Sequence, residues 1–238
     1  MNKPYGFAAS VTPSTEFHEE QPIVLDGIEI SVHAGHLEVG YDHEEDEHKA
    51  RRMARILVDA WRARTRVALE VGFDQAATWK PNSQGGKDMA IPLSDQATAT
   101  DRLCVTRETT GENGEPVVIE SDSYSILNDV QMTVKALNHK PLEDALRFYS
   151  QEGLDPKRPL YGIFKAIESI TKRLPGGRKE LGKLAGEPES TAEKFVGDVM
   201  QTANSIRHSN PTGGPVLSEQ ECKDRAYILI CAYADSLP

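Results

Sequence analysis

The sequence predicts an α+β N-terminal region followed by an all-α helical bundle. In the first part, short segments rich in β-branched residues are separated by glycine-containing turns, which is typical of strands. From about residue 123 onward, apolar residues recur instead at the spacing of amphipathic helices, in one segment after another. We therefore expect an α+β domain over residues 1–140, whose role the sequence does not indicate, and a helical domain over residues 141–238.

The expected N-terminal strands surround one long helix. Residues 22–35 alternate in part between apolar and polar side chains, and residues 36–42 follow Gly35, so a hairpin is expected there. A helix is expected over residues 44–64, because apolar residues recur there at three- and four-residue intervals. Residues 66–73 then return as a strand with one apolar face.

The rest of the chain divides into a loop, a strand pair and a series of helices. Residues 79–95 contain two prolines and two adjacent glycines, which predicts a long loop. Residues 102–121 have a Thr and Val content that suits strands and a turn between Gly111 and Gly114, so we expect two paired strands. Helical patterns follow over residues 123–139, 141–153, 158–177, 178–186, 189–208 and 217–237.

The composition limits the class of protein. A formal net charge of −10 argues against non-specific coating of nucleic acid, while a local basic face remains compatible with it. The cysteines Cys104, Cys222 and Cys231 form no CxxC pair, so neither a disulfide framework nor a zinc site is expected, and we interpret them as residues of a reducing compartment. Because no apolar stretch reaches the length of a signal peptide or a membrane span, we expect a cytoplasmic protein with no membrane partner.

A polar cluster ends one of the predicted helices. Asn204 and His208 are four residues apart and share a helix face, and Arg207 borders that face. An imidazole can move a proton, and a guanidinium can hold a phosphate and stabilise its transition-state charge, so the cluster suits chemistry on a phosphodiester. The alternative is that these cationic groups only complement the helix dipole and cap its last carbonyls.

The C-terminal part of the chain resembles the HEPN superfamily of small helical bundles. The shared features are a helix YGIFKAIESI, a short glycine-bounded stretch GGRKELGKLAG, a helix that ends on the polar cluster, the loop SNPTGG and a final helix SEQECKDRAYILICAY. The resemblance implies a HEPN-like helical bundle that forms a homodimer in which two polar motifs face each other. Many members are metal-independent ribonucleases, so it also implies RNA as a partner and no cofactor or metal.

The HEPN motif is an Arg, a polar residue such as Asn, three free positions and a His. When it is laid on this chain, its His falls on His208 and its polar residue on Asn204, but its Arg falls on Ala203. The resemblance therefore implies Asn204, Arg207 and His208 as the catalytic residues, with Arg207 acting in place of the missing arginine.

The resemblance also implies a biological setting and an alternative function. HEPN proteins often serve in bacterial toxin or antiviral defence systems, and the N-terminal region would then act as a sensor or bind a protein partner. Non-catalytic HEPN-like domains act as dimerisation or binding modules. Ala203 favours this alternative, as does the shortage of other acid–base candidates.

Three other patterns have weaker functional interpretations. The eight cations between Lys157 and Lys183 indicate either a phosphate-binding face or a solvated helix face. His43 and His48 flank four acidic residues, but their five-residue spacing does not match HExxH, and acidic residues in a first helical turn favour the helix dipole. A small-molecule enzyme in the α+β region would depend on Trp79, the predicted loop, and the pair His33 and His36.

Overall fold

The computed structural model describes residues 3–12, 22–33, 36–66, 70–90, 107–110, 116–119, 129–152, 160–208 and 214–238. The chain divides into two compact units, Met1–Ala54 with Leu69–Asn128, and Arg55–Ala68 with Asp129–Pro238. The first is an antiparallel sheet unit and the second is helical, so an α+β region is followed by a helical region, as the sequence predicts.

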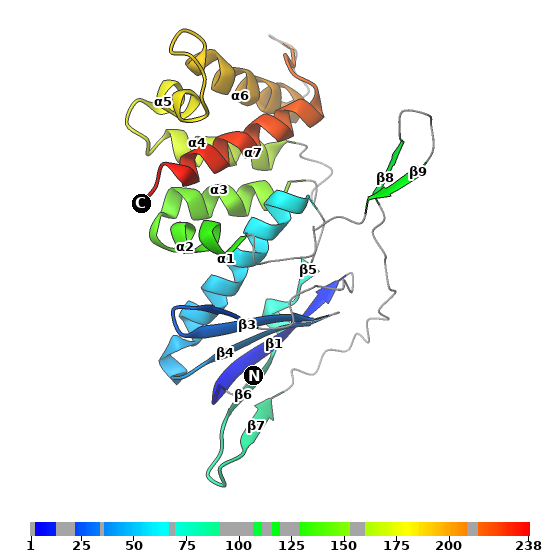
Figure 1. Cartoon of the computed structure of the whole chain (residues 1–238), viewed down its shortest axis with the longest axis vertical. Helices are drawn as coiled ribbons and strands as arrows, with labels where there is room; N and C mark the ends of the chain where they lie inside the picture. Colours follow the sequence, from blue (N-terminus) through cyan, green and yellow to red (C-terminus); the bar gives the residue numbers. More distant parts are fainter. Residues whose placement is uncertain are drawn as a thin grey trace. The chain divides into compact units, whose positions relative to one another are not determined.

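The sheet of the first unit has the strand order β2-β3-β4-β1-β6-β7, and β5 pairs with β1 beside this path (Figure 1). Every pairing is antiparallel. The bounds are β1 Tyr5–Thr12, β2 Ile23–Leu25, β3 Ile28–His33, β4 His36–Tyr41, β5 Glu70–Val71, β6 Ala77–Pro81 and β7 Lys87–Ala90.

The first part of helix α1 (Glu47–Thr65) packs with this sheet. Alternate residues of the central strands, among them Phe7 and Val39, are buried, as are Ala50 and Met53 of α1. Arg51 places its guanidinium over the Phe7 ring and donates a hydrogen bond to Glu47. A short 3-10 helix η1 (Glu44–Asp46) precedes α1, so the helix predicted from residue 44 is confirmed with its first turn more tightly wound.

The strand predictions are confirmed in part. The hairpin predicted across Gly35 is β3–β4, with His33 opposite His36. A second hairpin, β2–β3, lies within residues 22–35, because Asp26 and Gly27 both adopt the positive φ angles of a tight two-residue turn. The strand predicted over residues 66–73 is limited, among the described residues, to β5 and is followed by a 3-10 helix η2 (Phe73–Gln75).

The prediction of a long loop over residues 79–95 is wrong for the part that the structure describes. Residues 77–90 form the hairpin β6–β7 instead. Asn82 closes its turn by accepting hydrogen bonds from the amides of Gln84 and Gly86. The sequence signal is weak because β7 is exposed at every residue and so lacks an apolar face; residues 91–95 lie outside the described residues.

The strand pair predicted over residues 102–121 is confirmed where the structure describes it. Strands β8 (Arg107–Thr110) and β9 (Pro116–Ile119) pair antiparallel, with Arg107 opposite Ile119. The turn between Gly111 and Gly114 and the segment that holds Cys104 lie outside the described residues.

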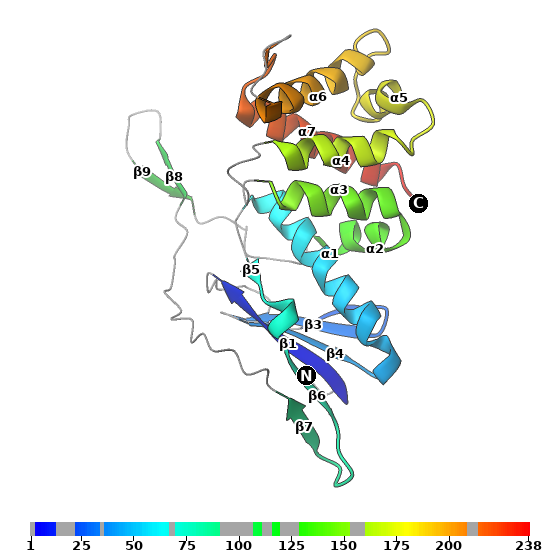
Figure 2. The ribbon, with the colours of Figure 1, turned by 180° about the vertical axis from the view of Figure 1, so that it is seen from behind.

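Within the described residues, the second unit comprises the end of α1 and six further helices. They are α2 Val130–Asn138, α3 Lys140–Ser150, α4 Tyr161–Thr171, α5 Gly177–Leu184, α6 Ala192–His208 and α7 Glu219–Asp235. Helices α3, α4 and α7 pack against one another, and α5 and α6 lie beside α4 (Figures 1 and 2). Each helical pattern in the sequence corresponds to one of these helices, although residues 123–128 lie outside the described part.

One apolar core runs through the helical unit. It joins Ile56 and Ala63 of α1 to fully buried residues of the other helices, such as Leu142, Ile167 and Leu229. Ser218 caps α7 by accepting a hydrogen bond from the amide of Glu221. No helix in the described ranges is long and apolar enough to cross a membrane.

Candidate functional site

The inward face of α6 fixes the position of the polar cluster. Val199 and Ala203 are fully buried in the helical core. Thr202, also fully buried, accepts hydrogen bonds at its hydroxyl from the amides of Val216 and Leu217, which anchors the segment before α7 to the last turns of α6. Asn204 and His208 therefore lie on the exposed side of this helix end, while its opposite side packs in the core.

The structure brings Asn204, Arg207 and His208 together. The Nη2 group of Arg207 donates a hydrogen bond of 2.8 Å to Oδ1 of Asn204 and contacts Nε2 of His208. A guanidinium only donates hydrogen bonds, so a hydrogen bond at this contact requires the imidazole tautomer in which Nε2 is the acceptor. The amide and the imidazole thus hold the guanidinium between them.

Aromatic rings of α4 complete the setting of Arg207. Its guanidinium carbon lies 4.8 Å from the centroid of the Phe164 ring and 5.7 Å from that of Tyr161. Its Nε is buried and has no hydrogen-bond partner among the described residues. A partly desolvated guanidinium interacts more strongly with an anion than an exposed one does, because the local dielectric is lower.

Contacts at the first turn of helix α4 fix its position. The carboxylate of Glu152 accepts hydrogen bonds from the amides of Leu160 and Gly162, at 2.7 and 3.0 Å. A Cβ on Gly162 would come within 2.3 Å of the Phe148 carbonyl oxygen, so glycine is required where α3 and α4 approach. The hydrogen bonds to Glu152 and the close approach at Gly162 thus fix the position of α4. They thereby also fix the Phe164 and Tyr161 rings, which support Arg207.

The residue that occupies the arginine position of the HEPN motif is part of the core. Ala203 has 0% of its surface exposed and belongs to the apolar cluster of the helical unit. A cation there would have to enter a close-packed apolar environment. The guanidinium that this helix end brings to the surface, within the described residues, is that of Arg207, which lies outside the motif and is partly exposed.

A hollow of about 520 Å³, lined by residues of α4, α5 and α6, adjoins the polar cluster. Asn204 belongs to both features, and Phe164 lines the hollow as well as supporting Arg207. The remaining lining residues are Arg178, Lys194, Gly197, Asp198, Met200 and Gln201. No pattern in the sequence predicts this hollow, because its walls come from three helices.

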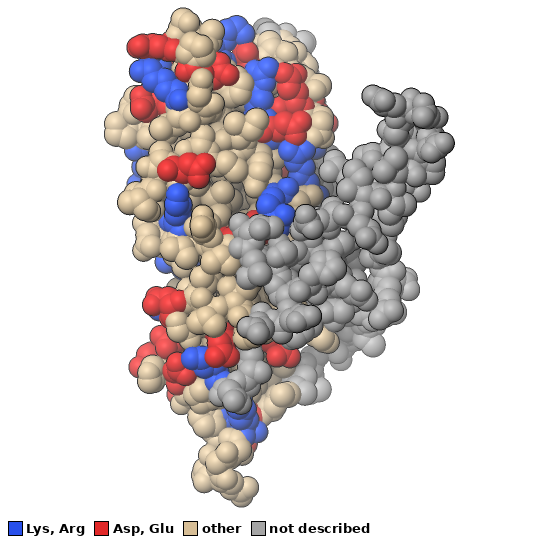
Figure 3. All heavy atoms as spheres, in the orientation of Figure 1, with Lys and Arg blue, Asp and Glu red and all other residues tan. Residues whose placement is uncertain are grey.

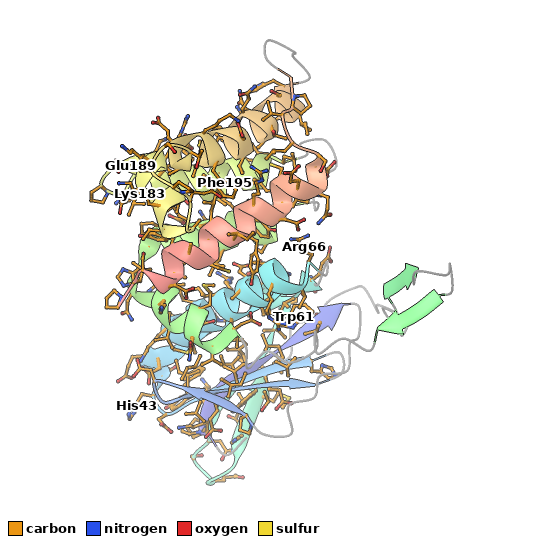
Figure 4. All side chains as sticks on the ribbon, turned by 45° about the horizontal axis from the view of Figure 1, so that its top comes forward. His43, Trp61, Arg66, Lys183, Glu189 and Phe195 are labelled. Atoms are coloured by element: carbon orange, nitrogen blue, oxygen red, sulfur yellow. The ribbon has the colours of Figure 1, made fainter. Side chains whose placement is uncertain are left out.

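Ion pairs neutralise much of the predicted basic stretch. Glu168 pairs with Lys165 and Lys172, and these contacts hold the pKa of its carboxyl below the usual value. Glu189, which follows the stretch in sequence, pairs with Lys179 and Lys183, and Figure 4 shows Lys183 and Glu189 side by side. On the face of the helical unit seen in Figure 3, charges of both signs are interleaved. A single broad phosphate-binding face is therefore not supported there.

Arg178 differs from its neighbours in this stretch. It is exposed at the hollow and has no ion pair among the described residues. Lys157 and Arg158, also part of the predicted basic stretch, lie outside the described residues.

The other sequence candidates belong to the sheet unit. His43 and His48 are both exposed, and the described residues contain no group of three or more potential metal-ligating side chains. Trp79 lies in strand β6 against Gly6, where a Cβ would meet its ring at 2.1 Å, so its position is explained by packing. His36 is exposed, and the side chain of His33 lies outside the described residues.

No family model, curated protein or solved structure matches this chain. The fold and the cluster define its class: a protein with an antiparallel sheet unit and a helical unit, in which one helix end presents an Asn–Arg–His cluster beside an open hollow.

Proposed function

We propose that the helical unit is a HEPN-like module that binds RNA and cleaves it without a metal ion at Asn204, Arg207 and His208. One observation carries the proposal: an arginine held by an aromatic ring lies in hydrogen-bond contact with both an amide and an imidazole at an exposed helix end. Cleavage of a phosphodiester by the neighbouring 2′-hydroxyl needs a group that moves protons and a cation that stabilises the phosphorane.

The geometry indicates how these residues would act. Arg207 would exchange its contact with His208 for a hydrogen bond that it donates to a non-bridging phosphate oxygen. Nε2 of the imidazole would then be free to accept a proton. His208 would then accept the proton of the 2′-hydroxyl as its oxygen attacks phosphorus and the bond to the 5′-oxygen breaks. The products are a 2′,3′-cyclic phosphate and a 5′-hydroxyl, and Asn204 would keep the guanidinium oriented throughout.

The leaving 5′-oxygen needs a proton from a second group. The described part of one chain presents a single histidine in the cluster, so a second copy that faces the first would supply the other acid. A homodimer is therefore part of the proposal. We also propose a cytoplasmic role in bacterial toxin or antiviral defence, with the sheet unit as sensor or partner-binding part.

A second function is favoured by the burial of Ala203. A module that has an alanine in the core where HEPN ribonucleases have their arginine would be a non-catalytic dimerisation or binding protein. In that case Arg207 has a structural role: it stabilises the end of α6, because it packs on the Phe164 ring and donates a hydrogen bond to Asn204.

The test uses the full chain with labelled tRNA and single-stranded RNA in EDTA, beside His208→Ala and Arg207→Ala. His48→Ala is the matched control, because His48 is also an exposed helical histidine but belongs to the sheet unit. We expect cleavage by the wild type and by His48→Ala, and a loss of at least about 100-fold in His208→Ala, as for a general acid–base group. Intact RNA with every protein would support the non-catalytic alternative.

A further inference from the structure

Gly197 stands in the interior of the 17-residue helix α6, where a glycine costs about 1 kcal/mol relative to alanine. Apart from its two chain neighbours and the nearby backbone of α6 itself, no described atom lies within 4 Å of the position that its Cβ would occupy. Gly182 differs, because a Cβ there would come within 2.2 Å of the Ala192 carbonyl oxygen. The packing of the described residues thus explains Gly182 but gives no reason for glycine at position 197.

The missing Cβ opens the wall of the hollow beside the polar cluster. Phe164 and Met200 supply apolar surface, and Gln201 and Asn204 supply amides that both donate and accept hydrogen bonds. The volume of about 520 Å³ lies within the range of roughly 300–1,000 Å³ that is usual for small-ligand sites. A flat polar ring fits such a site, because its face needs apolar contact and its edge needs amides.

The charges around the hollow favour an anionic ligand. Arg178 has no ion pair among the described residues, whereas Lys194 pairs with Asp198 at 2.7 Å. Arg207 adjoins the hollow through its hydrogen bond to Asn204. A ligand that combines a flat ring with phosphates would therefore meet apolar surface and Arg178 in the hollow, and Arg207 beside Asn204.

We infer that the hollow receives one unstacked base of a single-stranded RNA, which approaches the α6 backbone at Gly197, while the adjoining phosphates contact Arg178 and Arg207. This inference rests on the proposed RNA binding and adds a base subsite to it. Single-stranded RNA is recognised in this way, by bases that leave the stack and contact aromatic and amide side chains.

The experiment measures binding by fluorescence anisotropy with two short labelled probes of equal length. One is 2′-O-methyl oligoadenylate, which lacks the attacking hydroxyl, and the other is the same 2′-O-methyl chain without bases. Gly197→Leu fills the hollow and raises helix propensity, so it should fold at least as well as the wild type in a thermal melt. Gln131→Leu, an exposed change on α2, is the control for adding a surface leucine.

We expect the wild type and Gln131→Leu to bind oligoadenylate at least about fivefold more tightly than the baseless chain, as stacking of one base implies. Gly197→Leu should lose this preference and keep its affinity for the baseless chain. Arg178→Ala should weaken both probes by a similar factor, because it contacts phosphate.

The outcomes separate the two proposals. Equal binding of both probes by the wild type, or a preference that survives in Gly197→Leu, would overturn the base subsite and leave RNA binding in place. If the wild type binds neither probe, the proposed RNA binding fails and the base subsite fails with it.

Discussion

Ala203 is the residue at which the cluster departs most clearly from the HEPN motif. Its full burial means that Ala203→Arg, which restores the motif in sequence, would force a cation into the core. We expect this variant to lose about 3 kcal/mol or more of unfolding free energy, as an unpaired buried charge does. Urea unfolding followed by circular dichroism measures the loss. A variant as stable as the wild type would show that α6 turns this position to the surface.

Burial also determines the pKa and the reactivity of the Cys222 thiol. Its thiol lies 3.5 Å from the Val199 carbonyl oxygen, and burial, followed by the charges of Glu152 and Glu219, raises its pKa to about 12. We expect iodoacetamide at pH 8 to leave Cys222 unmodified in the folded chain and to modify it in urea, which peptide mass spectrometry detects. Because the folded pKa exceeds the unfolded one, this thiol stabilises the fold fully below about pH 9, and the contribution is lost as the pH rises toward 12. Rapid labelling under native conditions would contradict this burial.

At the scale of elements, an ion pair between partly buried Arg64 and buried Asp129 joins the end of α1 to the start of α2. The guanidinium of Arg64 donates hydrogen bonds of 3.1 to 3.3 Å to both carboxylate oxygens of Asp129, which is 3% exposed. Asp129→Ala leaves the buried side of this guanidinium without its carboxylate, so we expect a loss of about 3–5 kcal/mol.

The exposed pair of Lys140 and Asp144 gives the matched comparison for this loss. Lys140→Ala should change the unfolding free energy by less than about 1 kcal/mol. Equal effects of Asp129→Ala and Lys140→Ala in urea unfolding would mean that Asp129 is solvated.

The helices and strands differ in how well the sequence predicts them. The helices were predictable because their apolar stripes repeat at helical spacing, as in Ile163, Ile167 and Ile170 of α4. Strand β7 was not, since all of its residues are exposed and turn residues precede it. The pair Asp26-Gly27 is typical of a tight hairpin turn. However, the partial alternation of apolar and polar residues continues on both sides of it, so the division into β2 and β3 is hard to recognise from the sequence.

The site was predictable only along one helix. The spacing of Asn204, Arg207 and His208 places them together from sequence alone. The contact of Arg207 with Phe164 was not accessible, because it joins residues far apart in the chain. Glu189 was missed as a partner of the basic stretch for a related reason: it lies beyond the stretch and returns to it through the loop before α6.

At the scale of the whole molecule, the net charge of −10 limits how RNA can bind. Two cations, Arg178 and Arg207, are available for phosphate at the hollow and the cluster, because Lys194 pairs with Asp198. With about 0.7 counterions released per phosphate contact on a single strand, we expect the logarithm of the binding constant to fall with the logarithm of salt concentration at a slope of about −1.4. Anisotropy titrations across a salt series measure it, and a much steeper slope would indicate a broad basic surface instead.

The measurement that tests the central claim most directly is end-group analysis of RNA incubated with the full chain in EDTA. Action of Asn204, Arg207 and His208 on a phosphodiester should yield fragments with 2′,3′-cyclic phosphate and 5′-hydroxyl ends, and His208→Ala should yield none. Fragments of the same kind from His208→Ala, or intact RNA from a wild type that is folded and dimeric, would contradict the assignment of this helix end as a ribonuclease site.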